Sequence, residues 1–459
     1  MPSKLRKGLV WLLLVLVPAL WIGLESMGGA DHPAEEEASA EAASLSPITV
    51  MQGRLAVLLG GQALEPADPL GTRPMARLAA AMVLARAGQR ERGLEQIQLA
   101  QESKEDAPAA DLVEAVRAAV QAWPNRGDDG ARSTAPNALT AEQWKALDAH
   151  MGWFATLARA DLDGDPVAVK NVSDGLGWLM ILLAIAAIWF VGVGLAGVVL
   201  LVVLLSLAIV TRIRSGIETS PSMQVILGET FIAWMLTFLV IRVVSGWLFD
   251  RGEPGAGAMW ISMVCTFASL AALLWARVRG VRWRPFVEAA GLRWHGGFFR
   301  FCWMSATSYA CALPCMGIGV AVGLALSSLM KGRSFQDVSH PVQEMLPGAS
   351  GGMVVALFAI ACVAAPVVEE IAFRGLLYGH VRQETARWPR FLSIALAMLF
   401  SATIFAAIHP QGVLAVPALA GVSLGFCITR EWSGSVYPGM VAHGVHNGIL
   451  LALNLVLQP

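Results

Sequence analysis

Three groups of polar residues lie inside apolar segments near the C-terminal end of the chain, and the first contains two adjacent carboxylates. Glu369, Glu370 and Arg374 lie in the apolar segment 353–377. A charged side chain in the middle of a membrane span costs about 2.5–3.5 kcal/mol on insertion scales, so its presence calls for a function. On an α-helix Glu370 and Arg374 share a face and can pair, whereas Glu369 points about 100° away. We therefore predict that Glu369 is the carboxylate that is free to act as a base.

The other two groups contain histidine. His409 precedes Pro410, and proline disfavours helical backbone in the residue before it, so we expect a helix break from which the imidazole projects into a cavity. In the last apolar segment His443 and Asn447 are four residues apart and share a helix face. Both can donate hydrogen bonds, as a developing oxyanion requires. His446 lies on a neighbouring face and is expected to play a supporting role.

These side chains together indicate hydrolysis by an activated water molecule. A free carboxylate and a histidine can supply the base, and a His/Asn donor pair can stabilise an oxyanion. No serine or cysteine stands beside any of these histidines in the sequence. The pattern therefore favours a hydrolase that has no side-chain nucleophile.

The motifs Glu-Glu-x-x-x-Arg, Phe-x-x-x-His and His-x-x-x-Asn follow one another within residues 366–447. This ordered set resembles the CPBP family, the CAAX proteases and bacteriocin-processing enzymes also called the Abi family, which are intramembrane endopeptidases. The resemblance covers roughly residues 220–457, and residues 1–170 look like an added region. It implies that Glu369 and His409 activate the attacking water.

The resemblance also implies that His443 and Asn447 stabilise the tetrahedral intermediate, while Glu370 and Arg374 hold the site together. No cofactor is certain, because the family has been described both as metal-dependent and as metal-free. A divalent metal such as zinc is an open alternative, with Glu369, His409 and His443 as its three ligands. The absence of a His-Glu-x-x-His signature weighs against a metal.

The composition places most of the chain in a membrane. Of 459 residues, 56% are hydrophobic and only 15% are charged, more apolar than a soluble protein can usually hide. Basic residues are split among short loops, so no nucleic-acid partner is expected. All six cysteines lie in apolar segments, which argues against a disulfide framework. They are Cys265, Cys302, Cys311, Cys315, Cys362 and Cys427.

We predict an all-α, polytopic membrane bundle of about nine transmembrane helices. If the N-terminus lies inside the cell, most Lys and Arg of the loops also fall on the inside, as the positive-inside rule requires. With nine spans, this topology puts the C-terminus outside. The family-like domain is expected over 220–459 and a long transmembrane segment with a linker over 171–219. The predicted spans are 8–24, 176–210, 224–249, 258–276, 301–330, 353–377, 391–409, 412–429 and 436–457.

Two features of these spans stay open. Residues 176–210 would form a helix of about 50 Å, longer than the bilayer core. A hairpin at Gly192 to Gly197 would invert every later span, so we prefer one long helix, which keeps the Arg-rich segment 277–300 inside. Glu229 and Arg242 lie 13 residues apart in one span. They are too far apart to pair along one helix, and we assign them no role.

Residues 1–30 read as a signal anchor or a signal peptide, with Gly28 and Ala30 at a candidate cleavage site. Residues 31–170 are predicted to be an extracytoplasmic, mostly helical domain that begins with an acidic linker reaching to about residue 50. We expect helices near 72–88, 91–104, 108–123 and 139–160. With 13 basic and 21 acidic residues, this domain has a solvated surface and could bind a partner.

The most favoured function is an intramembrane endopeptidase of the bacterial inner (plasma) membrane. Its expected partners are membrane lipid and a membrane-associated or lipid-modified substrate with a CAAX-like or leader-peptide sequence. A non-catalytic membrane scaffold or a bacteriocin-immunity protein is the first alternative. A proton-coupled transporter that uses Glu369 and His409 as a relay is the second. Acyl chemistry needs the His443/Asn447 donor pair, whereas a proton relay does not need Asn447.

Overall fold

The computed structural model describes residues 3–31, 45, 47–58, 70, 73–103, 107–123, 138–173, 176–210, 215–220, 222–249, 255–294, 296–330, 345–346 and 349–457. Every regular element in these ranges is a helix, which confirms the predicted all-α class. The chain divides into two compact units. One consists of residues 1–28, 188–326 and 340–452, and the other of residues 29–187, 327–339 and 453–459.

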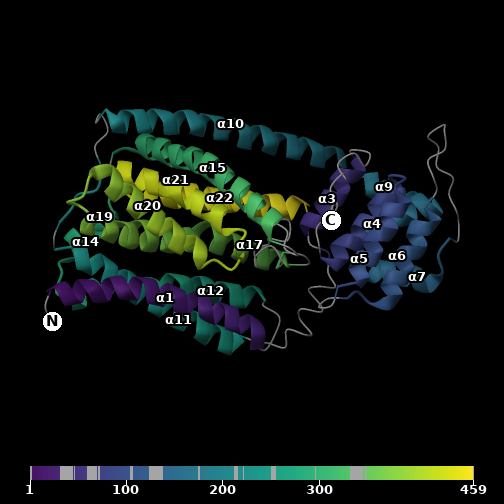
Figure 1. The fold of residues 1–459 in the computed structure, drawn as a ribbon, viewed down its shortest axis with the longest axis horizontal. Coiled ribbons are helices and arrows are strands. Elements are labelled where there is room, and N and C mark those ends of the chain that lie inside the picture. The colour runs from purple at the N-terminus through teal and green to yellow at the C-terminus, as the bar shows by residue number, and fades with distance from the viewer. Residues whose placement is uncertain are drawn as a thin grey trace. The chain divides into compact units, whose positions relative to one another are not determined.

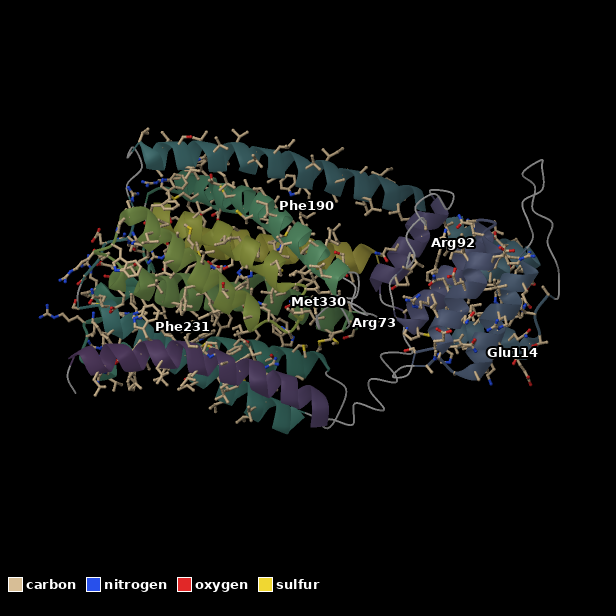
Figure 2. The ribbon with its side chains drawn as sticks, viewed as in Figure 1. Arg73, Arg92, Glu114, Phe190, Phe231 and Met330 are labelled. Atoms are coloured by element: carbon tan, nitrogen blue, oxygen red, sulfur yellow. The ribbon has the colours of Figure 1, made fainter. Side chains whose placement is uncertain are left out.

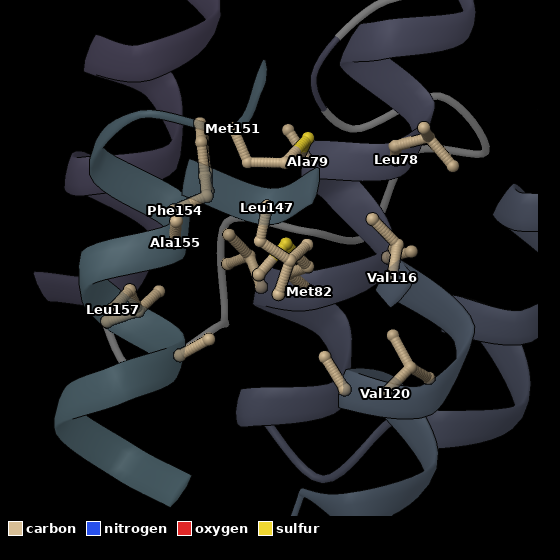
Figure 3. Close-up of a cluster of buried hydrophobic side chains, with 14 of the residues drawn as sticks. Leu78, Ala79, Met82, Val116, Val120, Leu147, Met151, Phe154, Ala155 and Leu157 are labelled. Carbon is tan, nitrogen blue, oxygen red and sulfur yellow. The ribbon is translucent and has the colours of Figure 1, made fainter. Parts of the chain in front are cut away.

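The second unit is a small helical domain with an alanine-rich core (Figure 3). Leu78, Met82, Val116, Leu147 and Phe154 are buried at its centre. Small side chains allow close helix packing, and a Cβ on Gly93 would lie 2.8 Å from the Ala81 carbonyl oxygen. The helices are α3 (Pro47–Leu58), α4 (Pro74–Arg86), α5 (Arg90–Gln101), α6 (Ala110–Ala122), α7 (Ala141–His150), α8 (Trp153–Ala158), the π-helical η1 (Arg159–Asp163) and α9 (Pro166–Ser173).

The first three helices predicted for this domain correspond to α4, α5 and α6. The fourth segment, expected to be helical over 139–160, is helical but divided in two. α7 ends at His150 and α8 begins at Trp153, because Gly152 adopts a φ of +47° that breaks the helix. The predicted acidic linker lies largely outside the described residues.

The first unit is a bundle of long apolar helices that run roughly side by side (Figure 1). α10 is one continuous helix, as preferred from the sequence. The helices that build the bundle, wholly or in part, are α1 (Ser3–Asp31), α10 (Leu176–Ile209), α11 (Gln224–Phe249), α12 (Ala256–Ala268), the 3-10 stretch η2 (Ser269–Leu274), α13 (Trp275–Val278), α14 (Trp283–Ala289), α15 (Phe298–Leu329), α17 (Gly351–Ala359), the π-helical η4 (Ile360–Ala364), α18 (Ala365–Glu369), the π-helical η5 (Glu370–Leu377), α19 (Tyr378–Glu384), α20 (Arg390–Ala407), α21 (Val416–Ser433) and α22 (Tyr437–Leu457).

Seven helices in the described residues are long and apolar enough to cross a membrane. They correspond to the first seven of the nine predicted spans. α21 and α22 match the last two in position but are not among the seven. The seven spans are Leu5–Gly23, Ile181–Ala208, Gln224–Ser245, Ala256–Val278, Phe298–Leu329, Gly351–Glu384 and Arg390–Ala407.

Aromatic packing fixes the helix that carries the two glutamates against α11. The Phe231 ring lies 5.6 Å from that of Phe373 on η5, and the Trp234 ring lies 5.7 Å from it. Phe231 is fully buried at this contact. Edge-on aromatic pairs of this kind contribute about 0.5–1.5 kcal/mol beyond the burial of their area. The segment 370–377 is therefore packed on one side against the aromatic face of α11.

Candidate active site

The helical stretch from Gly351 to Glu384 is interrupted twice by π-helix, and Glu369 and Glu370 lie where the second interruption begins. η4 covers 360–364 and η5 covers 370–377. A π-helix widens the hydrogen-bonding pattern to i→i+5 and occurs frequently at functional sites. This arrangement was not predicted from the sequence.

Side chains from three neighbouring helices bind backbone carbonyls of the π-helical stretches. Ser401 Oγ on α20 donates to the Phe373 carbonyl at 3.0 Å. Arg430 Nε on α21 donates to the Arg374 carbonyl at 3.1 Å. Asn447 Nδ2 on α22 donates to the Ala361 carbonyl at 2.8 Å. Unbonded backbone groups are costly inside a membrane, so these donors stabilise the altered helix and tie α20, α21 and α22 to it.

Glu370 and Arg374 form the ion pair expected from their spacing. Arg374 Nη1 lies 2.9 Å from Glu370 Oε1, and both side chains are at most 1% exposed. The guanidinium is also 4.5 Å from the centre of the Phe405 ring and 5.2 Å from that of Phe426. The positive charge is therefore balanced by one carboxylate and by two aromatic faces.

His443 lies between the two glutamates. Its Nδ1 is 3.1 Å from Glu370 Oε1, and its Nε2 is 3.7 Å from Glu369 Oε2. The ring stacks on Phe426 with 5.2 Å between centroids. A carboxylate oxygen accepts hydrogen bonds, so at this contact the Nδ1 of His443 donates to Glu370. The contact between Glu370 and His443 was missed by the sequence analysis, since a pair 73 residues apart leaves no local signal.

Glycine allows α22 to approach this closely. A Cβ on Gly439 would lie 2.7 Å from Glu370 Oε2, and a Cβ on Gly444 would lie 2.3 Å from the Cys362 carbonyl oxygen. A side chain at position 444 would meet backbone, and one at position 439 would displace the carboxylate end of Glu370. The close approach of α22 to η4 therefore depends on Gly444.

Glu369 and His409 are the more accessible members of the group. The Glu369 side chain is 23% exposed, against 1% for Glu370, and His409 is half-buried. α20 ends at Ala407, two residues before His409, so the helix break predicted ahead of Pro410 is present.

The environment of His409 defines its neutral tautomer. Its Nδ1 lies 2.5 Å from the Phe405 carbonyl, and it interacts electrostatically with Glu369 and His443. A carbonyl oxygen can only accept, so the Nδ1 of His409 carries the hydrogen and the Nε2 of the neutral ring is a lone-pair acceptor.

The remaining predicted residues lie at the edge of the group. Asn447 shares α22 with His443, but its amide donates to the backbone of η4. One of its two amide hydrogens is used in this way, which leaves the second for another acceptor. His446 is buried on a different face, with its ring 6.1 Å from that of Tyr309. His446 is therefore not part of the contacts between His443 and the glutamates.

The alternative of a zinc ion held by Glu369, His409 and His443 does not fit this geometry. Within the described residues, no three His, Cys, Asp or Glu side chains come together in a group that could hold a metal ion. His443 directs both ring nitrogens at carboxylates. We therefore derive no step through a metal.

Comparison with known proteins places this group inside a family match. Residues 351–449 match the family described as Type II CAAX prenyl endopeptidase Rce1-like, which confirms the resemblance found from the motifs. The match includes all six predicted site residues, whereas residues 1–350 lie outside it. No curated protein and no solved structure matches the chain. The match supports a CAAX-type intramembrane peptidase, and with the seven apolar helices it supports a multi-pass integral membrane protein.

Proposed function

We propose that this protein is an intramembrane endopeptidase that hydrolyses a peptide bond in a membrane-associated or lipid-modified substrate of the CAAX-like or leader-peptide type. The observation that carries the proposal is the position of His443. It lies between an accessible carboxylate, Glu369, and a buried one, Glu370, which is itself paired with Arg374. The family match over the same residues supports the same reaction class.

In this mechanism Glu369 and His409 activate the attacking water. Glu369 takes a proton from the water while the water oxygen bonds to the carbonyl carbon of the substrate. The unprotonated Nε2 of His409 accepts a hydrogen bond from the other O–H of the water and so orients the water molecule. General-base catalysis of this kind contributes about 10²–10⁴-fold to a rate. The proton then passes to the amine as the carbon–nitrogen bond breaks, and the water oxygen ends in the new carboxylate.

His443 and Asn447 stabilise the oxyanion of the tetrahedral intermediate. In its doubly protonated form, His443 donates from Nδ1 to Glu370 and carries a second hydrogen on Nε2. In this mechanism the Nε2–H of His443 and the second amide hydrogen of Asn447 are the donors to the oxyanion. Removal of one such donor typically costs about 2.7–4 kcal/mol in the transition state.

Burial supports this division of roles. Glu369 and His409 are partly exposed, as groups that contact substrate and water must be, whereas Glu370 and Arg374 are buried. We place the protein in the bacterial inner membrane with residues 31–170 outside the cytoplasm. There the helical domain could recruit substrate or a partner protein.

Quantitative peptide mapping of membranes tests the proposal and identifies the substrate. Cells with the wild-type protein are compared with cells that carry Glu369→Gln at matched expression. We expect a membrane protein or lipopeptide to accumulate uncut only with Glu369→Gln. In H₂¹⁸O, the wild-type product should gain one ¹⁸O in its new C-terminal carboxylate.

Glu218→Gln is the matched control, because the Glu218 side chain is 90% exposed and lies outside the site. It should process the substrate like the wild type. Equal peptide profiles for wild type and Glu369→Gln, together with a lost cellular phenotype in the variant, would contradict the peptidase and favour the scaffold or the transporter.

A further inference from the structure

A second polar group lies away from the candidate active site, at the start of α11. Glu229 Oε1 is 2.6 Å from Arg6 Nε, and its Oε2 is 2.9 Å from Arg6 Nη2. The same Oε2 accepts from Trp275 Nε1 at 3.2 Å and lies 3.2 Å from Arg279 Nε. Glu229 thus joins α1, α11 and the end of α13. The sequence analysis considered only Arg242, on the same helix, as a partner for Glu229 and did not predict these contacts.

These groups line one end of a cavity of about 650 Å³ between α1, α11 and α13. This volume is in the range of about 300–1,000 Å³ that is typical of small-molecule sites. The rest of the wall is apolar, with Leu9 and Leu13 from α1 and Ile232 and Leu236 from α11. Leu9 and Leu236 are each 43% exposed, so the apolar part opens at the surface of the bundle.

The charged end of the cavity has an excess of positive charge. Two guanidinium groups share one carboxylate, and among the described residues Glu229 is the only acidic side chain that pairs with either. Each guanidinium has five N–H donors. Glu229 accepts two hydrogen bonds from Arg6, and its Oε2 lies 3.2 Å from the Nε of Arg279. Further donors therefore remain for an anion. The Arg6 and Arg279 side chains are 30% and 37% exposed.

We propose that this cavity binds an anionic phospholipid, with the phosphate at Arg6 and Arg279 and an acyl chain between α1 and α11. A net positive end matches a phosphate, and forked guanidinium groups bind phosphate with two parallel hydrogen bonds. An apolar wall that opens on the outside of a membrane bundle matches a lipid chain. Basic pockets between transmembrane helices are a known setting for anionic headgroups.

The occupied site would hold α1 against the helix that supports the candidate active site. Glu229, Ile232 and Leu236 face the cavity, whereas Phe231 and Trp234 on the same helix contact Phe373 of η5. The proposal stands independently of the proposed peptidase, because none of the lining residues belongs to the candidate active site.

Native mass spectrometry of the full chain tests the proposal with phosphatidylglycerol and phosphatidylcholine of matched acyl chains. We expect the wild type to retain phosphatidylglycerol at least five-fold better than phosphatidylcholine. Arg279→Gln should weaken phosphatidylglycerol binding about five-fold, the factor expected for one basic residue near an anionic lipid. Leu236→Trp, at an exposed position, should fill the apolar end and lower the binding of phosphatidylglycerol while both arginines remain.

Arg284→Gln is the matched control, since the Arg284 side chain is 89% exposed, pairs with Glu288 and lies outside the cavity. It should bind phosphatidylglycerol like the wild type. Equal retention of the two lipids by the wild type, or unchanged binding in both Arg279→Gln and Leu236→Trp, would overturn the proposal. Full displacement of phosphatidylglycerol by an equal concentration of inorganic phosphate would identify an anion site without a lipid chain, which overturns it as well.

Discussion

At the scale of single residues, two adjacent glutamates occupy different environments. Glu369 is partly exposed and faces His443 across 3.7 Å. Glu370 is closed off and contacts both Arg374 and His443. One carboxylate is therefore placed to meet substrate, while its neighbour neutralises and orients other groups. Substitutions of the two should separate activity from stability.

Glu369→Gln should lower the rate of substrate cleavage by about 10²–10⁴-fold, the usual contribution of a general base. Its unfolding midpoint should stay close to that of the wild type, because a partly exposed amide leaves no buried charge unpaired. Cleavage rates and thermal unfolding in the same detergent check both statements. A large fall in the unfolding midpoint would show that Glu369 is structural.

Glu370→Gln should destabilise the protein by about 3–5 kcal/mol, because it leaves the Arg374 charge buried without its carboxylate. Denaturant unfolding in micelles measures this change. The double substitution of Glu370→Leu with Arg374→Met should recover much of the stability, since apolar residues of similar size often replace a buried pair without loss. It should not recover cleavage, because His443 loses its partner. Equal stability of Glu370→Gln and Glu369→Gln would contradict this assignment.

At the scale of helices, the close approach of α22 to the π-helical stretch η4 defines the geometry of the group. Gly444 leaves no room for a Cβ beside the Cys362 carbonyl. Asn447, one turn further along, donates to the Ala361 carbonyl. The position of His443 on α22 therefore depends on a glycine contact and on a backbone hydrogen bond.

Gly444→Ala should push α22 away from η4 and shift His443 relative to Glu369. A displacement of about 1 Å can cost about 100-fold in rate, so we expect a loss of that order in cleavage. Gly317→Ala is the control, because a Cβ on this glycine of α15 meets nothing within 4 Å. The rate of Gly317→Ala should match that of the wild type, and an active Gly444→Ala would contradict the argument.

α1 should be retained in the mature protein as an anchor. Its Val10, Leu14 and Trp21 are buried in the bundle, and Arg6 pairs with Glu229. Loss of this helix would expose an apolar face of α11 and leave Glu229 with one fewer partner. Mass spectrometry of the intact protein from membranes should find the N-terminal residues. A mature N-terminus close to Gly28 or Ala30 would show that the segment is a cleaved signal.

The sequence predicts those features that depend on local spacing. The Glu370–Arg374 pair follows from helix periodicity, and the helix break before His409 follows from proline chemistry. The long helix α10 follows from the distribution of Arg along the chain. The π-helical stretches do not, because residues that form them have the composition of any apolar helix. The contacts of His443 with Glu370 and of Glu229 with Arg6 cannot be predicted from local sequence either, because each contact joins helices that are far apart in the sequence.

At the scale of the whole molecule, the chain combines an apolar bundle with a separate helical domain. The two units have independent cores. The family match lies entirely outside the helical domain. The distribution of Arg predicts that this domain and the Arg-rich segment 277–300 lie on opposite sides of the membrane.

Labelling with a membrane-impermeant maleimide tests this topology in intact cells. Glu114→Cys, at an exposed position of the helical domain (Figure 2), should react from outside. Arg284→Cys, where the native side chain is 89% exposed, should react only after the membrane is opened. Wild-type protein reports the background from its own cysteines. The reverse pattern would invert the topology.

The two π-helical stretches give the span 351–384 an unusual response to changes in chain length. Each stretch turns by less per residue than an α-helix does, so the faces before and after it are out of phase. Removal of one residue from 360–364 would shorten the span by only about 1.5 Å. It would also rotate Glu369 and Glu370 around the helix axis relative to Gly351. In this span a deletion changes mainly the direction in which the two carboxylates point, because that direction depends on the number of residues per turn in the preceding helix.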